Sequence, residues 1–176
     1  SYVLEYLSKY FEITIYYYNP NIYPKSEFEF RLEEQKRFVS AFGSNNPDNH
    51  PIRVIEGIYE DDRYYEVVKG LEDEPERGVR CTECFKLRLG EAAKVASEKG
   101  FDYYTTTLSI SPHKDAELLN RLGEEIGREY GVKYLYSDFK KRNGFKRSTE
   151  LSEEYGMYRQ NYCGCVYSYK ERLKMQ

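Results

Sequence analysis

Two hydrophobic patterns alternate along the chain. Segments rich in β-branched and aromatic residues predict strands at residues 13–18, 52–55, 103–107 and 132–136. Apolar residues at helical spacing predict helices at residues 2–7, 26–42, 61–71, 81–100, 148–155 and 166–175, and another from the loop at 111–114 to residue 130. Strands that alternate with helices in this way indicate an α/β fold with a parallel sheet and helices on both faces.

The helices also carry signals for their ends and buried faces. Ser26 and Glu29 form an S-x-x-E capping box at the start of the helix at 26–42, and Ser111 is a candidate N-cap before the helix that ends at 130. The residues expected in the core are Phe28, Leu32, Phe38, Val39, Phe85, Leu89, Ala92, Ala96, Leu118, Leu119, Leu122 and Ile126.

Nothing repeats internally and no linker is long enough to divide the chain, so we expect a single α/β domain over residues 1–176. A cysteine-containing loop and a helix form its C-terminal end at about 156–176. The pattern opens on a helix at Tyr2, whereas an α/β unit normally presents a strand first. We therefore expect a leading strand and its loop ahead of residue 1, so that this sequence is truncated at its N-terminus.

Composition excludes some classes of protein. Charged residues make up 32% and hydrophobic residues 40%, which argues against general disorder. No apolar run approaches the ~18 residues that a membrane helix needs. The net charge of −3 argues against a basic coat for nucleic acid but not against a local basic patch. The 20 tyrosines suit a wet binding surface as well as a core.

The four cysteines form two close pairs. Cys81 and Cys84 form a C-x-x-C at a predicted helix start, and Cys163 and Cys165 form a C-x-C in a polar, aromatic loop. Close pairs in a chain with no visible export signal indicate metal or redox chemistry in a reducing compartment, so we expect a cytoplasmic protein. Inert buried thiols are the alternative.

Each pair has its own alternatives. A helix N-terminus favours thiolates and an anionic cluster at Cys81 and Cys84, although a thioredoxin-like dithiol has the same spacing. Cys163 and Cys165 suit metal chelation or a strained, reducible disulfide. The two pairs are 79 positions apart, whereas zinc ribbons place theirs about 12–20 residues apart. A shared site would therefore be assembled by the whole fold.

Two further segments are candidates for binding. Ser111 and His113 follow the strand at 103–107, where ligands bind in open parallel sheets, and His113 is a candidate proton donor. A surface histidine without a role is the alternative. Basic and aromatic residues at 138–147 suit an RNA backbone with unstacked bases, unless they form a solvated loop. The basic residues are Lys140, Lys141, Arg142, Lys146 and Arg147.

With these motifs identified, the chain resembles the cobalamin-independent epoxyqueuosine reductases of the QueH type. The matching strings include R-C-T-E-C-F-K-L-R-L at 80–89, T-T-T-L-S-I-S-P-H-K at 105–114, D-F-K-K at 138–141 and Y-R-Q-N-Y-C-G-C at 158–165. They follow the family's order from about residue 16 to 168. The family also carries a Cys-Cys pair after its first strand, and that pair is absent from these 176 residues.

The resemblance implies a fold, a reaction and a cofactor. The fold would be a three-layer, nucleotide-alpha-hydrolase-like (HUP-like) one. The reaction would reduce epoxyqueuosine to queuosine at the tRNA wobble position, the last step of queuosine synthesis, with electrons from a donor that the residues leave open. A [4Fe–4S] cluster would be held by Cys81, Cys84 and the upstream Cys-Cys pair. Cys163 and Cys165 would act as a redox pair or help to hold an additional iron.

The implied chemistry is coherent with the residues present. Removal of an epoxide oxygen needs two electrons and two protons, and the protons could come from His113, Tyr162 or a bound water. We expect Ser111, Arg159, Gln160 and Tyr162 to contact the substrate. A zinc-stabilised RNA-binding module, a thiol–disulfide redox protein and a nucleotide-alpha-hydrolase relative that adenylates a substrate remain alternative interpretations.

Overall fold

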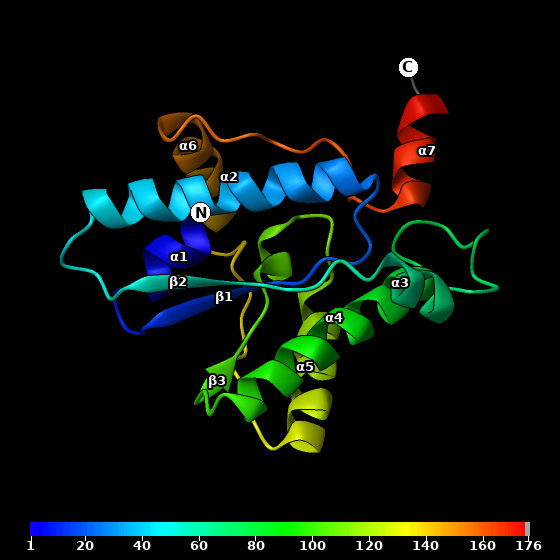
Figure 1. Ribbon diagram of the computed structural model, residues 1–176, viewed down its shortest axis with the longest axis horizontal. Coiled ribbons are helices and arrows are strands. Elements are labelled where there is room, and N and C mark those ends of the chain that lie inside the picture. Colours follow the sequence, from blue (N-terminus) through cyan, green and yellow to red (C-terminus); the bar gives the residue numbers. More distant parts are fainter. Residues whose placement is uncertain (175–176) are drawn as a thin grey trace. The chain divides into compact units, whose positions relative to one another are not determined.

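The computed structural model describes residues 1–174, which form two compact units. The first unit comprises Ser1–Asp61 and the chain from Lys146 onward, and the second comprises Asp62–Phe145. The helices and strands are drawn in Figure 1. Because two compact units can belong to one domain or to two, the single domain stays a prediction.

The first unit is built on a pair of parallel strands. Strand β1 (Ile13–Tyr17) pairs with β2 (Ile52–Glu56) from Ile13↔Ile52 to Tyr17↔Glu56. A parallel pair needs a long crossover, which α2 (Lys25–Asn45) supplies. The core cluster between them contains Leu4 of α1 (Tyr2–Leu7), Phe38 and Phe42, with Ile13, Ile15 and Ile52 packed against it.

Two further helices complete the first unit. Helix α6 (Gly144–Glu154) belongs to the first unit from Lys146 onward, since its first two residues are the last two of the second unit. Helix α7 (Val166–Lys174) ends the described chain. The irregular segment between them runs along α2 before it reaches α7, as Figure 1 shows in orange. Met175, the predicted last residue of this helix, lies outside the described residues.

The second unit is mainly helical. It contains α3 (Asp61–Val67, of which Asp61 belongs to the first unit), α4 (Val79–Glu98), the short strand β3 (Tyr103–Tyr104), a 3-10 helix η1 (Thr107–Ile110), α5 (Ala116–Tyr130) and β4 (Lys133–Tyr134). Strands β3 and β4 are parallel. The core lies mainly between α4 and α5, where Phe85, Leu89 and Ala93 meet Leu119 and Ile126.

The capping and boundary predictions are partly wrong. Ser26 lies inside α2, which begins after Pro24 without a side-chain cap, so the capping box does not form. Asp115 caps α5 by accepting hydrogen bonds from the Glu117 and Leu118 amides, because an aspartate directly before the helix displaces Ser111 from that role.

Several elements are shorter or longer than the sequence predicts. The strand at 103–107 ends at Tyr104, since Thr106 caps η1 by accepting a hydrogen bond from the Leu108 amide. Helix α6 begins at Gly144, so Lys146 and Arg147 are helical rather than part of a loop. On α4, the predicted core residues Phe85, Leu89 and Ala96 are buried, whereas Ala92 is only half-buried and its neighbour Ala93 is fully buried instead.

The predicted fold class is confirmed. The structure is mixed α/β, with about 53% helix and short parallel strands. The nucleotide-alpha-hydrolase-like assignment stays a prediction. No helix within residues 1–174 is long and apolar enough to cross a membrane.

Candidate functional site

The first cysteine pair lies at the start of α4, as predicted. Cys81 and Cys84 are the third and sixth residues of this helix, and they are half-buried and buried, respectively. The backbone N–H of Arg77 donates to Cys81 Sγ at 3.2 Å. An N–H donor and a helix N-terminus both stabilise a thiolate, so this turn suits sulfur that bears negative charge.

The loop with Ser111 and His113 lies beside this cysteine. Arg77 Nη2 is 2.9 Å from His113 Nδ1, so one residue contacts the Cys81 sulfur through its backbone and the imidazole through its side chain. Ser111 Oγ accepts a hydrogen bond from the His113 backbone N–H at 3.2 Å and thereby fixes the loop. The structure therefore brings three predicted residues, Cys81, Ser111 and His113, into one constellation within the second unit.

Two arginines of this constellation escaped the sequence analysis. Arg77 has a φ of 74°, a left-handed conformation that is unusual for a residue other than glycine and that aims its amide at Cys81. Arg80 is 3% exposed, and its Nη1 donates to the carbonyls of Leu71 (3.2 Å), Glu72 (2.8 Å) and Glu74. The string E-R-G-V-R directly before C-x-x-C was the available signal.

The second cysteine pair lies in a loop of the first unit that two hydrogen bonds hold to Tyr23, and we call these two bonds the clamp. The Tyr23 amide donates to the Gly164 carbonyl at 2.8 Å, and the Tyr162 hydroxyl donates to the Tyr23 carbonyl at 2.8 Å. Gly164 has a φ of 120°, and a Cβ there would lie 3.2 Å from Ile22 Cγ1 and 3.3 Å from Arg31 Nη1. Only glycine therefore suits the middle of the C-x-C.

Cys165 directly precedes helix α7. The Ser168 amide donates to Cys165 Sγ at 3.5 Å, and Ser168 Oγ accepts a hydrogen bond from the Cys163 amide at 3.1 Å. Cys165 thus caps the helix with a thiol in place of the usual hydroxyl, and the Ser168 side chain binds back to Cys163, two residues before the cap. The chemistry of this cysteine pair is therefore coupled to the start of a helix.

One face of α2 holds the loop before the cysteines. Arg31 donates to Glu27 Oε1 at 2.8 Å and to Gln160 Oε1, and its guanidinium lies 5.1 Å from the centre of the Tyr162 ring. Glu34 accepts a hydrogen bond from the Tyr158 amide at 3.0 Å, and Arg37 donates to the carbonyls of residues 155 and 156. Charges of alternating sign at positions 27, 31, 34 and 37 were a signal that sequence analysis passed over.

The tyrosines of this loop keep their protons. Burial and the nearby Glu27 carboxylate raise the pKa of Tyr162 above its ordinary value. Burial, followed by the hydrogen bond that its hydroxyl donates to Glu27 at 3.1 Å, raises the pKa of Tyr158 in the same direction. Both hydroxyls therefore remain donors at neutral pH. Arg159, between them, is exposed.

Four of the five residues of the predicted basic segment lie near acidic partners. Lys140 and Lys141 both pair with Asp138, at 3.3 and 3.7 Å. Arg147 pairs with Glu5, and Lys146 lies 4.0 Å from Glu150. The group is also divided, because residues 140–142 belong to the second unit and residues 146 and 147 to the first. Within residues 1–174, Arg142 is the member of this group without an ion pair.

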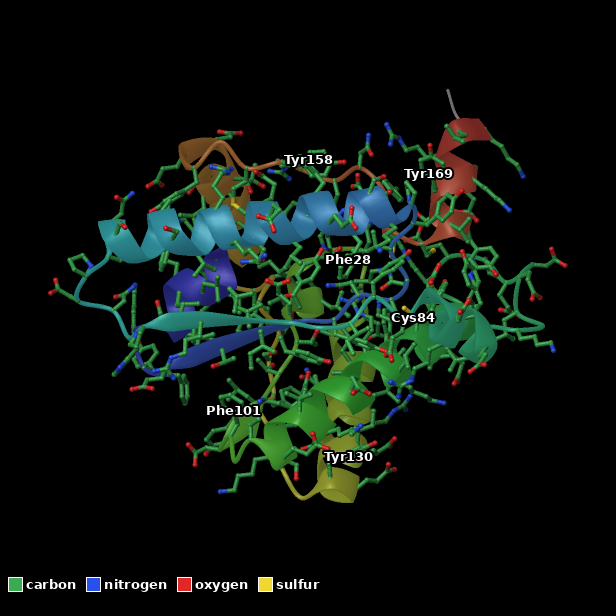
Figure 2. All side chains as sticks on the ribbon, in the orientation of Figure 1. Phe28, Cys84, Phe101, Tyr130, Tyr158 and Tyr169 are labelled. Carbon is green, nitrogen blue, oxygen red and sulfur yellow. The ribbon has the colours of Figure 1, made fainter. Side chains whose placement is uncertain are left out.

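The residues at α4 fit half of a four-cysteine cluster site. Two thiols one helical turn apart, with an amide donor at one of them, are the expected contribution of a C-x-x-C. Within residues 1–174 no group of three or more His, Cys, Asp or Glu side chains is arranged to hold a metal. Cys84 is labelled in Figure 2 on α4.

Comparison with known proteins confirms the resemblance found in the sequence. The family model described as epoxyqueuosine reductase QueH matches residues 1–171. The chain is 46% identical over 170 residues to the epoxyqueuosine reductase QueH of Streptococcus pyogenes serotype M1, covering 97% of this chain and 66% of that protein.

Other relatives bear the same name. The protein of Staphylococcus epidermidis is 46% identical over 170 residues, covering 96% of this chain and 71% of its own length. The protein of Thermotoga maritima is 37% identical over 158 residues, covering 89% and 79%. The chain thus spans about two thirds of the length of the first two relatives, and it belongs to the epoxyqueuosine reductase QueH family.

Proposed function

We propose that this chain contributes the substrate and redox residues of an iron–sulfur reductase that converts epoxyqueuosine to queuosine at the wobble position of tRNA. The family match over residues 1–171 supports the reaction. The observation that carries the assignment of residues is the contact of Arg77 with both Cys81 and His113, which joins a cluster-ligand motif to a proton donor. We expect the reaction to take place in the cytoplasm.

Cys81 and Cys84 would hold a [4Fe–4S] cluster together with the Cys-Cys pair that the family resemblance implies ahead of residue 1. When bound, such a cluster supplies electrons one at a time. The Arg77 amide would remain a donor to the Cys81 sulfur, since its position is fixed by the turn that Arg80 holds to residues 71–74.

Cys163 and Cys165 would supply or relay the electron pair. As a dithiol they can form a disulfide and release two electrons and two protons, which balances conversion of the epoxide to an alkene and water. In the alternative role they help to hold an additional iron, and the electrons then come from a donor protein or small reductant. In both roles the clamp at Gly164 fixes the backbone between the two sulfurs.

The remaining candidates would bind the substrate and move protons. His113, oriented by Arg77, and Tyr162, whose raised pKa keeps it protonated, are the proton donors that we assign. Ser111, Arg159 and Gln160 would contact the modified nucleoside. Of the basic segment, Arg142 is the strongest candidate for RNA contact, since Lys140 and Lys141 share a carboxylate and Lys146 and Arg147 are paired.

The test is conversion of tRNA that carries epoxyqueuosine by full-length protein purified without oxygen, combined with iron, sulfide and zinc analysis. Conversion by protein that contains iron and sulfide supports the proposal. Zinc alone with tRNA binding and no conversion would favour an RNA-binding module. Reduction of protein disulfides without iron or RNA would favour a thiol redox protein, and either result would overturn the proposed function.

A further inference from the structure

Helix α7 and the loop before it carry a net positive charge. Residues 158–174 contain four basic residues and one acidic residue, a net charge of +3 in a chain whose net charge is −3. The basic residues are Arg159, Lys170, Arg172 and Lys174. Within residues 1–174 none of the four forms an ion pair, in contrast to the paired lysines and arginine of the segment at 138–147.

Exposed aromatic rings lie in the same unit as these charges. Tyr23, Phe30 and Tyr158 are 40%, 48% and 41% exposed, which leaves a large part of each ring accessible to a flat ligand. Tyr158 packs edge-on against Phe30 at 5.0 Å, and Tyr23 packs edge-on against Tyr169 of α7 at 5.9 Å. Figure 2 shows Tyr158 beside α2 and Tyr169 at α7.

Tyr162 links the charges to the rings. The guanidinium groups of Arg31 and Arg172 lie 5.1 and 5.9 Å from the centre of its ring, and Tyr169 packs against it at 5.5 Å. With two cations over it, this ring has little surface left for a ligand. The ring face holds Arg172 in position next to the loop that α2 fixes.

We propose that α7, the loop at 158–162 and the exposed rings of Tyr23 and Phe30 form an RNA-contacting surface of this protein. Lys170, Arg172 and Lys174 contact phosphates, and the rings of Tyr23, Phe30 and Tyr158 stack on unpaired bases. Accessible rings beside unpaired cations suit single-stranded RNA, because bases stack on aromatic side chains while phosphates bind the cations. An acidic protein partner would use the charges but would leave the rings unexplained. The inference rests on the proposed function, in which the RNA is the tRNA substrate.

The first experiment measures the salt dependence of tRNA binding by the full-length protein and by the variant Lys170→Ala, Arg172→Ala, Lys174→Ala. Each lost contact with a single-stranded phosphate lowers the log–log slope by about 0.7, so we expect a slope lower by about two units. If the variant and the unaltered protein bind tRNA equally at 1 M salt, this difference in slope makes the variant bind about a hundredfold more weakly at 0.1 M.

A second variant guards against loss of the helix. Lys170 and Lys174 are both exposed, so Lys170→Gln with Lys174→Gln leaves the packing of Arg172 on Tyr162 in place and should lower the slope by about 1.4. The matched control removes three cations of the second unit that already have partners. These are Lys94, Arg128 and Lys133, paired with Glu91, Glu124 and the ring of Tyr103. The control should keep the slope of the unaltered protein.

Tyr158 separates stacking from charge. Tyr158→Leu should weaken binding about tenfold without a change of slope, because it removes a ring and no cation, whereas Tyr158→Phe should retain the affinity. If the unaltered protein binds tRNA and the Lys170/Lys174 variant keeps its slope, the surface proposed here is wrong and the proposed function stands; an acidic protein partner then becomes the better occupant. If the unaltered protein binds no tRNA, both fail.

Discussion

The two cysteine pairs are held in place by different means. Cys81 and Cys84 lie within one helix, and the amide that binds Cys81 belongs to Arg77, four residues away. Cys163 and Cys165 lie in a loop whose neighbours Gln160 and Tyr162 bind groups 129 and 139 residues away in sequence. The geometry of the first pair is therefore a local property of the chain, whereas that of the second depends on the folding of the first unit.

This difference matches the roles that we propose. A cluster ligand has to keep a fixed geometry, and a helix start with an N–H···S hydrogen bond supplies it with few residues. A pair that changes its redox state or its ligand needs a fixed backbone between its sulfurs. The clamp fixes this backbone without engaging either sulfur, because its contacts are made by the Gly164 carbonyl and the Tyr162 hydroxyl.

The comparison is tested most directly by replacing each cysteine with serine in the full-length protein. Cys81→Ser or Cys84→Ser should abolish the cluster, and with it the bound iron, the sulfide and the iron–sulfur absorbance, because a cluster ligand is lost. Cys163→Ser and Cys165→Ser should leave most of the cluster and abolish conversion of epoxyqueuosine. Undiminished iron–sulfur absorbance in Cys84→Ser would refute the assignment of the first pair.

His113 tests whether the contact through Arg77 matters for the chemistry. His113→Gln should lower turnover about a hundredfold, in the range found for general acids, and should leave iron and sulfide content unchanged. His50 is the matched control because it is the only other histidine in the sequence and lies in a loop of the first unit, and His50→Gln should retain turnover. Loss of iron in His113→Gln would make His113 a structural support of the cluster turn instead.

How far the sequence predicts the structure follows the same division. The start of α4 at the C-x-x-C could be predicted, since spacing and helix periodicity are local. The joining of His113 to Cys81 could not, because it depends on the left-handed turn at Arg77. Likewise, the hold of α2 on the loop and the shared pairing of Asp138 with Lys140 and Lys141 need side-chain positions that composition does not supply.

Arg31 tests the long-range clamp. Its side chain is 10% exposed and binds Glu27, Gln160 and the ring of Tyr162, so Arg31→Met should lower the free energy of unfolding by about 1–2 kcal/mol. Lys25→Ala on the same helix removes an exposed pair with Glu29 and should cost about 0–0.5 kcal/mol. Denaturant titration compares the two, and hydrogen exchange should quicken at residues 158–165 only in Arg31→Met.

Ser168 tests the local part of the second cysteine site. Its hydroxyl accepts a hydrogen bond from the Cys163 amide, and its own amide donates one to Cys165 Sγ. Ser168→Ala removes the first contact and retains the second, so it should lower the free energy of unfolding by about 0.5–1 kcal/mol, as the loss of one capping hydrogen bond does.

The control is Ser44→Ala, which removes an exposed hydroxyl bound to the Ser40 carbonyl within α2 and should change the free energy of unfolding by less than about 0.5 kcal/mol. Because Ser168 is buried and its bond joins the C-x-C to α7, its loss should also quicken amide exchange at Cys163, while the Tyr23 amide stays protected by its separate bond to the Gly164 carbonyl. Equal exchange at Cys163 in both variants would mean that the long-range clamp alone orders this loop, and that the cap at α7 contributes nothing to the geometry of the cysteine pair.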